Sequence, residues 1–322
     1  MSEIKKVPLI ETRSLDKFFN VPKGTLKAVN HVDLQIHRGK TLGVVGESGC
    51  GKSTLGRTIL KILQPTSGDI LFDGKSVLNL STKEEQGFRK KAQIIFQDPY
   101  SSINPRMSVS DAIADPLIVN RVCSNKKELQ EKVAELMDTV GLAERLWSAY
   151  PHELDGGRLQ RIGIARALAL NPQFIVCDEP VSALDVSIQA QILNLLMDLQ
   201  EEHDLTYMFI THDLSVVRHI SDEIMVMYLG RCVERAPKTE LFENPAHPYT
   251  KALLSAIPKP TLESRYEDAQ LIKGELTSPI NPAPGCAFAA RCEYACDRCR
   301  QSDIRMTCVG ENHYAACVLL EK

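Results

Sequence analysis

The sequence has no long apolar run. No stretch approaches about 18 consecutive apolar residues in a chain of 322, so no segment is expected to span a bilayer as a helix. The first ten residues include Glu3, Lys5 and Lys6 and have no apolar core, which argues against a secretory signal peptide. We therefore expect the protein to stay in the cytoplasm and to meet a membrane only through a partner.

The sequence also lacks an excess of charge of either sign. It contains 38 Lys and Arg against 41 Asp and Glu, a formal net charge of -3. Such a balance gives no electrostatic reason to expect a nucleic-acid partner. Internal repeats and low-complexity tracts are absent too. The length allows one large domain, or one large domain with an appendage.

Proline is sparse in most of the chain and frequent near its end. Nine prolines lie in residues 1–236 and eight in the last 86. We place the end of the main domain near residue 236, which leaves residues 237–322 as a Pro-rich arm and a tail. Residues 244–248, 257–260 and 278–284 are expected to be extended connectors.

The main domain alternates strand-like and helix-like stretches, which predicts an α/β fold with a parallel sheet. Ligands of such sheets bind at the carboxyl ends of the strands. The predicted strands are 41–45, 93–96, 174–178 and 207–211, and the predicted helices are 53–63, 128–140 and 158–170.

A glycine-rich loop follows the first of these strands. It matches the phosphate-loop pattern G-x-x-x-x-G-K-[ST] after a strand and before a helix. Glycines let backbone N–H groups surround a phosphate, and the helix N-terminus adds partial positive charge. Lys52 is expected to reach the β- and γ-phosphates, and Ser53 to bind Mg²⁺. The loop comprises Gly46, Glu47, Ser48, Gly49, Cys50, Gly51, Lys52, Ser53 and Thr54.

Two carboxylates follow the apolar strand 174–177. Asp178 is expected to organise Mg²⁺, and Glu179 to polarise the attacking water. An Asp-Glu pair after a strand is usually a solvated strand end, but its position after a phosphate loop makes the catalytic interpretation more specific. Cys177 is interpreted as a small core residue.

The segment 154–161, Leu-Asp-Gly-Gly-Arg-Leu-Gln-Arg, resembles the LSGGQ signature of the ABC ATPase family. This resemblance implies a P-loop NTPase core with a helical subdomain at about residues 100–170 that carries the signature. It also implies that Asp155, Gly156 and Gly157 face ATP held by a second ATPase subunit, each subunit setting its phosphate loop against the other's signature.

Other motifs resemble those of the family and occur in the family's order. Gln97 is similar to the Q-loop glutamine, which senses the γ-phosphate, joins Ser53 and Asp178 around Mg²⁺ and touches the transmembrane partner. Asp185 matches the D-loop, and His212 the switch histidine. Phe19, with Phe18 as the alternative, stands where an aromatic residue stacks on adenine. The resemblance thus implies Glu179, His212 and Gln97 as the catalytic residues.

The signature departs from its family at two positions. Asp155 stands where Ser is usual, and Arg158 stands where Gln is usual. A carboxylate there would bring negative charge toward the γ-phosphate, at a cost of about 1–4 kcal/mol at ~4 Å. Alternatively, Asp155 is an N-cap whose charge Arg158 neutralises three residues later.

The segment 244–254, Asn-Pro-Ala-His-Pro-Tyr-Thr-Lys-Ala-Leu-Leu, resembles the C-terminal extension of the oligopeptide/dipeptide importer ATPases. Members of that group pair with a sister ATPase, two permease subunits and an extracytoplasmic binding protein. The resemblance therefore implies ATP hydrolysis with Mg²⁺ that drives peptide import, at the cytoplasmic face of the cell membrane. Nickel importers share this architecture.

Six of the ten cysteines fall in the last 37 residues. In a reducing compartment such a cluster indicates a metal site rather than disulfides. Zinc, an iron–sulfur cluster and free thiols are all open from the residues alone. The spacing lacks paired C-x₂-C knuckles and resembles the motif of dipeptide-importer ATPases that bind [4Fe-4S]. This implies Cys286, Cys292, Cys299 and Cys317 as ligands, with Cys296 and Cys308 extra.

A second class of function is a soluble ABC-type ATPase that acts on DNA in repair. Those proteins insert long coiled coils or large modules between the phosphate loop and the signature. Here about 100 residues separate the two motifs, and the chain is not basic. The transporter interpretation is therefore the main one.

Overall fold

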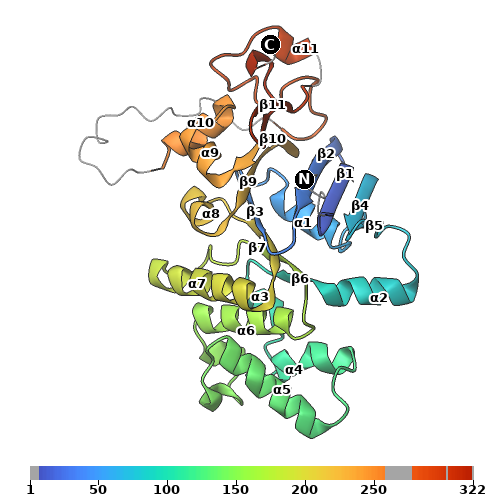
Figure 1. Cartoon of the computed structure of the whole chain (residues 1–322), viewed down its shortest axis with the longest axis vertical. Helices are drawn as coiled ribbons and strands as arrows, with labels where there is room; N and C mark the ends of the chain where they lie inside the picture. Colours follow the sequence, from blue (N-terminus) through green and yellow to red (C-terminus); the bar gives the residue numbers. More distant parts are fainter. Residues whose placement is uncertain (1–6, 258–277, 302–303, 321–322) are drawn as a thin grey trace, which may run out of the picture. The chain divides into compact units, whose positions relative to one another are not determined.

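The computed structural model describes residues 7–257, 278–301 and 304–320. The chain forms two compact units (Figure 1). The predicted boundary at residue 236 falls inside unit 1, so the C-terminal tail and the phosphate loop belong to the same unit. Unit 1 comprises Met1–Ile36, Thr41–Leu78 and Thr211–Lys322, and unit 2 comprises His37–Lys40 and Asn79–Ile210.

Unit 1 contains two sets of paired strands. The first is a four-stranded antiparallel sheet in the order β2-β1-β4-β5, built on a long β1–β2 hairpin. The second runs β11-β12-β10-β9-β3, and β3 pairs with β9 in parallel. The bounds are β1 Ile10–Val21, β2 Gly24–Ile36, β3 Thr41–Val45, β4 Ser67–Phe72, β5 Lys75–Ser76, β9 Glu223–Tyr228, β10 Arg231–Pro237, β11 Thr307–Gly310 and β12 His313–Ala315.

The tail completes the second set of strands in unit 1. β12 pairs antiparallel with β10, at the edge of the main-domain strands, and β11 follows as the outer strand. Residues 307–310 and 313–315 therefore share a sheet with β10, the strand that precedes the arm. The helices of unit 1 are α1 Lys52–Ile59, α8 Leu214–Ile220, α9 Lys238–Glu243, α10 Pro248–Ser255 and α11 Arg298–Gln301, with a 3-10 turn η4 at Val318–Leu320.

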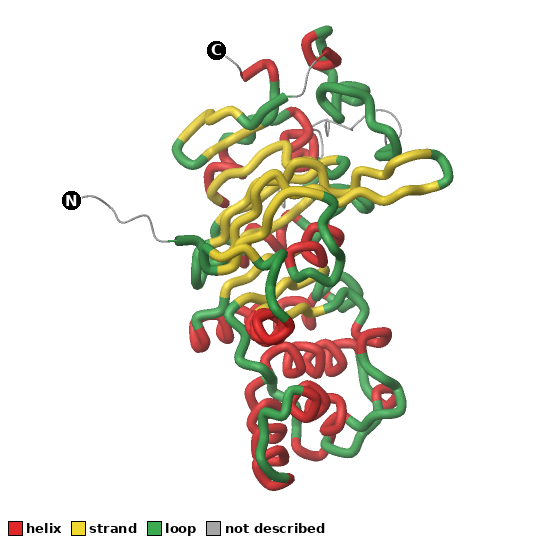
Figure 2. The backbone as a smooth tube through the Cα atoms, turned by 90° about the vertical axis from the view of Figure 1, so that its right-hand side faces the viewer, coloured by secondary structure: helices red, strands yellow, loops and turns green. Residues whose placement is uncertain are grey.

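Unit 2 has a parallel three-stranded part in the order β8-β7-β6. All five residues of β7 are buried, as expected for a parallel strand covered on both faces. Between β6 and β7 every described element is helical, and Figure 2 shows helices of this stretch side by side in red. The elements are α2 Thr82–Lys91, β6 Ala92–Ile95, α3 Pro99–Ser102, α4 Val109–Val119, α5 Lys126–Thr139, η1 Glu144–Leu146, η2 Pro151–Glu153, α6 Gly156–Leu168, β7 Phe174–Asp178, α7 Val186–His203 and β8 Thr206–Ile210.

Two strands agree with their predicted bounds to the residue, and one predicted helix was too long. β3 and β7 cover 41–45 and 174–178 as expected. The helix predicted over 53–63 ends at Ile59, because Lys61 takes a left-handed conformation with φ 57° and turns the chain.

The arm is not extended throughout, contrary to the prediction for residues 244–248. α9 ends at Glu243 and α10 begins at Pro248, so the connector between them is only four residues long. Proline is compatible with the first turn of a helix, where its missing N–H has no partner to lose. Residues 278–284 contain no helix or strand, and of the predicted connector 257–260 only Ile257 lies within the described residues.

Candidate active site

The phosphate loop links the buried strand β3 to α1 in unit 1. Gly51, which N-caps α1, has φ 106°, and a Cβ there would collide with the carbonyl oxygen of Ala28. Only glycine fits this close approach. Lys52 is 5% exposed, and its ammonium group donates to the carbonyl oxygens of Gly46 at 2.7 Å and Glu47 at 3.1 Å. The loop's own backbone thus holds the phosphate-binding lysine.

Other predicted residues of unit 1 lie on β1 and just before α8. Phe18 and Phe19 are both half-buried, and each has a lysine ammonium near its ring. His212 is exposed between Thr211 and Asp213. Asp213 N-caps α8 by accepting from the amide of Ser215 at 2.7 Å. The turn that presents His212 is therefore fixed by this cap.

The predicted carboxylates of unit 2 lie at the end of β7. Asp178 is fully buried and Glu179 is 9% exposed. Gln97 follows β6, the parallel neighbour of β7, and its Nε2 donates to Oε2 of Glu179 at 3.0 Å. Glu179 has φ 47°, a left-handed conformation that is uncommon for non-glycine residues and clusters at functional sites.

The signature segment begins helix α6 in unit 2. Asp155 is the N-cap, and its Oδ1 accepts from the amide of Arg158 at 2.8 Å. Its Oδ2 lies 3.3 Å from Nη1 of Arg158, with side chains 52% and 44% exposed. The predicted local cap and ion pair are therefore both present in this geometry.

The signature glycines lie against the D-loop and the start of α7. A Cβ on Gly156 would be 3.0 Å from Cδ2 of Leu184, and one on Gly157 would be 2.7 Å from Cγ2 of Ile188. These close approaches leave no room for larger residues without a shift of the neighbours. Asp185 is exposed and N-caps α7 through its backbone, without a side-chain cap.

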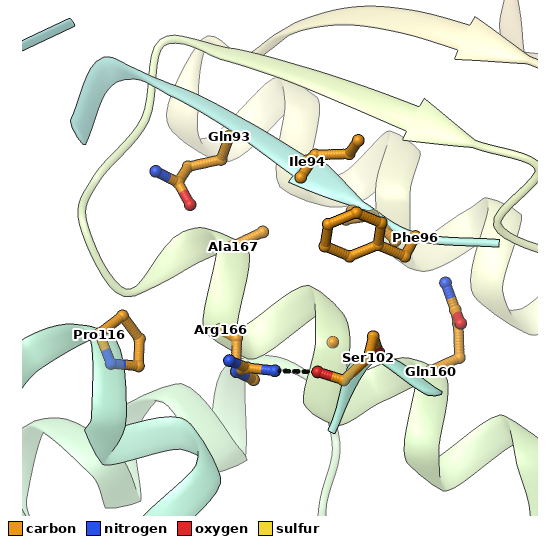
Figure 3. A pocket seen from close by; sticks show the side chains of 10 residues that line it. Gln93, Ile94, Phe96, Ser102, Pro116, Gln160, Arg166 and Ala167 are labelled. Atoms are coloured by element: carbon orange, nitrogen blue, oxygen red, sulfur yellow. Dashed lines mark hydrogen bonds between the residues drawn. The ribbon is translucent and has the colours of Figure 1, made fainter. Parts of the chain in front are cut away.

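A cavity of about 160 Å³ lies beside β6 and α6 in unit 2 (Figure 3). Phe96, Pro116 and Gln160 line it, and Nη1 of Arg166 donates to the carbonyl of Ser102 across it at 2.6 Å. Nε2 of Gln160 and Nε of Arg166 are buried and have no hydrogen-bond partner within the described part of the chain. Buried donors of this kind favour a partner that supplies acceptors.

The four predicted cysteine ligands line a single pocket of the tail in unit 1. Cys286, Cys292, Cys299 and Cys317 contribute to it, whereas Cys296 and Cys308 are exposed and do not. The amide of Cys286 donates to the carbonyl of Cys299 at 2.7 Å, which closes the loop that carries three of them. Among residues 7–257, 278–301 and 304–320, no group of three His, Cys, Asp or Glu side chains is arranged to hold a metal ion.

Two buried polar contacts join the tail to the rest of unit 1, and sequence reasoning missed both. Glu234 on β10 is fully buried and accepts from the amides of Ala246 and His247 and from Nε2 of His313. Arg291 pairs with Glu47 of the phosphate loop at 2.8 Å. The partners are 79 and 244 residues apart in sequence, so no local pattern could reveal them.

The start of α10 is set by His247. Burial lowers the pKa of His247 to about 4, so the imidazole is neutral near pH 7. Its Nδ1 then accepts from the amide of Tyr249 at 3.1 Å and caps the helix. The hydroxyl of Tyr249 in turn accepts from the amide of Glu47 at 3.0 Å.

Comparison with known proteins decides the family. The profile described as "ABC transporter" matches residues 29–182, and "Oligopeptide/dipeptide transporter, C-terminal region" matches residues 233–299. The dipeptide transport ATP-binding protein DppF of Escherichia coli is 48% identical over 98% of this chain and 95% of its own. The oligopeptide transport ATP-binding protein AppF of Bacillus subtilis is 47% identical over 99% of each. This chain belongs to the ABC transporter ATP-binding family.

Solved structures agree with this ABC ATPase assignment. The dimeric ATP-binding cassette MJ0796, bound to ADP and Pi, is 29% identical with a TM-score of 0.65 and covers 71% of this chain and 98% of its own. CbiO1 of Clostridium perfringens, part of the transporter complex cbiONQ, is 29% identical with a TM-score of 0.66, covering 74% and 92%. The predicted α/β P-loop fold and ATPase activity are confirmed. None of the described helices of this ABC ATPase is long and apolar enough to cross a membrane.

Proposed function

We propose that this chain is the ATP-hydrolysing subunit of an ABC importer of dipeptides or oligopeptides. The observation that carries this proposal is the ordered match to two family regions, the ATPase at 29–182 and the peptide-transporter extension at 233–299. Relatives at 47–48% identity over nearly the full length are named for dipeptide and oligopeptide transport. The chain would act as a peripheral subunit on the cytoplasmic side of the cell membrane.

The predicted site residues have three roles in ATP hydrolysis: nucleotide binding, metal coordination and activation of water. Phe19 stacks on adenine, residues 46–54 surround the phosphates, and Lys52 neutralises the β- and γ-phosphates. Ser53, Asp178 and Gln97 would supply oxygen ligands for Mg²⁺, and the bound ion would neutralise charge that develops on the phosphates. Asp185 and His212 are the remaining residues of the proposed ATP site.

Glu179 is the general base in this proposal. Its carboxylate orients a water, whose oxygen forms a bond to the γ-phosphorus while the bond from that phosphorus to the β–γ bridging oxygen breaks. ADP leaves, and the water's proton passes to the carboxylate. The hydrogen bond from Gln97 and the buried position at the end of β7 hold the carboxylate in one orientation.

The signature completes a second ATP site in a head-to-tail pair with a sister ATPase. Asp155, Gly156 and Gly157 of this chain would face the γ-phosphate held by the partner's loop. The solved cassette MJ0796 is itself described as dimeric. Two permease subunits and an extracytoplasmic solute-binding protein complete the importer.

The cavity of unit 2 is the proposed docking place for a cytoplasmic segment of a permease subunit. The buried donors of Gln160 and Arg166 call for backbone carbonyls or a carboxylate from that segment. Apolar side chains are exposed near the end of α4, with Ile118 at 58% and Val119 at 72%. Exposed apolar groups beside unsatisfied donors are typical of an interface.

The tail pocket is the proposed site of a [4Fe-4S] cluster with a structural role. Four thiols from residues 286–317 line one pocket, a donor set that suits such a cluster.

The test is transport by the complete complex in proteoliposomes. With the binding protein present, a labelled dipeptide should accumulate only with ATP, and Glu179→Gln should abolish uptake. The matched control is Glu201→Gln, which removes an exposed carboxylate of α7 in the same unit. ATP-dependent uptake of Ni²⁺ with no uptake of peptide would overturn the peptide assignment.

A further inference from the structure

Glu47 of the phosphate loop is joined to the tail through both its backbone and its side chain. Its amide donates to the hydroxyl of Tyr249 on α10 at 3.0 Å. Its carboxylate accepts from Nη1 of Arg291 at 2.8 Å. Arg291 immediately precedes Cys292, so the Cys-rich segment itself supplies the cation.

Glu47 also contacts the lysine that binds phosphate. Its carbonyl oxygen accepts from Nζ of Lys52 at 3.1 Å. Arg291, Glu47 and Lys52 therefore form a continuous chain of charged and polar contacts within unit 1. A change at Arg291 reaches the phosphate-binding ammonium through one intervening residue.

The guanidinium of Arg291 is held in place by its surroundings. The side chain of Arg291 is 8% exposed, and its Nη1 also contacts the hydroxyl of Tyr228 at 3.3 Å. Phe288 of the same tail segment packs edge-on against Tyr228 at 5.3 Å and tilted against Tyr249 at 5.3 Å. Both tyrosines are fully buried. Arg291 is thus anchored to the core and cannot swing to another partner without unpacking these rings.

We propose that Arg291 is a positioning residue for the phosphate loop, through which the C-terminal tail sets the affinity for nucleotide. The inference rests on the proposed nucleotide-binding role of residues 46–54. Arg291 touches neither phosphate nor metal in this proposal. It balances the charge of Glu47 and fixes the loop residue whose carbonyl holds Lys52.

The charges give the direction of each effect. Without Arg291, the carboxylate of Glu47 is an uncompensated negative charge beside a site for a polyanion, which repels phosphate and competes for Lys52. Without the charge of Glu47, the guanidinium remains beside the loop and favours an anion. Replacing Arg291 should therefore weaken ATP binding, whereas neutralising Glu47 should not. A purely structural contact would make both changes harmful.

The experiment measures the dissociation constant of Mg-ATP for the full-length chain and five variants. We expect Arg291→Gln to bind ATP about tenfold more weakly. Glu47→Gln keeps the loop backbone and loses only the side-chain charge, so it should bind ATP more tightly than the wild type. The double variant should recover most of the lost affinity. Arg300→Gln removes an exposed cation from the same tail and is the matched control, expected to be unchanged.

The double variant also distinguishes the proposed charge effect from simple unfolding of the tail. Any damage caused by removing Arg291 is present in it too, so recovery of affinity would come only from the charge on Glu47. In the assembled complex, Arg291→Gln should raise KM for ATP more than it lowers kcat, because Gln97 and Glu179 are unchanged. Arg291→Lys, which keeps the charge, should rescue much of the affinity.

Equal affinity of Arg291→Gln and the wild type would overturn the proposal. So would a double variant as weak as Arg291→Gln, because the effect would then not pass through Glu47. Failure of the wild-type chain to bind ATP would instead contradict the proposed function. The two failures are therefore distinguishable in one set of titrations.

Discussion

The side-chain amide of Gln97 donates a hydrogen bond to the carboxylate of Glu179 over 3.0 Å. The contact arises because β6 and β7 are parallel neighbours, so the residues that follow them leave the same edge of the sheet. The amide of Glu179 donates to the carbonyl of Ile210, the last residue of β8. The carboxylate of Glu179 is thus fixed by three features: its left-handed backbone, the hydrogen bond of its amide and the hydrogen bond of its side chain.

Glu179→Gln should abolish turnover and preserve ATP binding. Loss of the general base is expected to lower kcat by about a hundredfold to ten-thousandfold, while Lys52 and the loop amides still hold the phosphates. Steady-state ATPase assays and nucleotide titrations of the complex would measure the two effects. Glu201→Gln, on the exposed surface of α7, should change neither.

Lys52→Ala should show the opposite pattern, because it removes the cation that faces the phosphates. Nucleotide affinity should fall in Lys52→Ala, whereas the control Lys75→Ala, an exposed lysine of the same unit, should bind nucleotide as the wild type does.

For the earlier Glu179→Gln prediction, an unchanged ATPase rate would remove Glu179 from the catalytic role.

Gln97→Glu should move the acidic limb of the ATPase pH profile to higher pH. The change places a second carboxylate within hydrogen-bond distance of Glu179, and like charges that close raise the pKa of one member of the pair. The pair then shares a proton up to a higher pH, and the base is inactive whenever it carries that proton, so activity appears only at higher pH. The measurement is kcat between about pH 5.5 and 9, a range that brackets the ionisation of a carboxylate with a raised pKa.

Gln97→Ala is the control for the loss of the amide alone. It removes the hydrogen bond without adding charge, so its pH profile should shift less than that of Gln97→Glu. Identical profiles for the two variants would show that the added charge does not reach Glu179, contrary to the 3.0 Å contact.

Asp155→Ser should raise the ATPase activity of the assembled complex. In the proposed head-to-tail dimer, the carboxylate would repel the γ-phosphate held by the partner subunit. The ion pair with Arg158 is about half exposed, so it offsets that charge only in part. Serine is also a good N-cap, so α6 should keep its stability. Arg158→Gln should lower activity, because it removes the neutralising cation.

The same argument predicts unequal ATP sites. One site combines this chain's phosphate loop with the partner's signature, and it should hydrolyse ATP. The other site combines the partner's phosphate loop with Asp155 of this chain, and it should hydrolyse ATP slowly. Glu179→Gln here should therefore be far more damaging than the equivalent change in the partner. Equal damage from both changes would mean that Asp155 is a tolerated cap.

Protein purified without oxygen should be brown and contain about four iron atoms per chain. Serine substitution of Cys286, Cys292, Cys299 or Cys317 should remove the iron, because each thiol lines the tail pocket. Cys296→Ser and Cys308→Ser are the matched controls and should retain it. Iron analysis and the visible absorption spectrum are the measurements, and a colourless protein with about one zinc would contradict the cluster.

The sequence predicted most of the central elements because their signals are local. Fewer than ten consecutive residues are enough to recognise the apolar runs of β3 and β7 and the glycine-rich loop. Both strands match their predicted bounds. Helix ends were less predictable. α1 stops at Ile59 because Lys61 turns the chain, and α6 starts at Gly156 because Asp155 caps it.

The tail was the least predictable part, since proline was interpreted as a sign of extended chain. Pro248 instead stands at the first position of α10, where a missing N–H costs nothing. The contact between Arg291 and Glu47 joins residues 244 positions apart. Glu47 belongs to the phosphate-loop pattern, but that pattern sets no residue type at its position, and Arg291 belongs to no motif.

The buried carboxylate of Glu234 has consequences for how the chain is made. Its acceptors are filled by the amides of Ala246 and His247 and by the imidazole of His313. During synthesis, β10 leaves the ribosome long before His313 exists, and until then this carboxylate has to stay in contact with water. Two of its three donors follow within 13 residues, but the side of β10 that pairs with β12 stays uncovered. A nascent chain stalled before residue 313 should therefore be more open to proteases at β10 than the full-length chain.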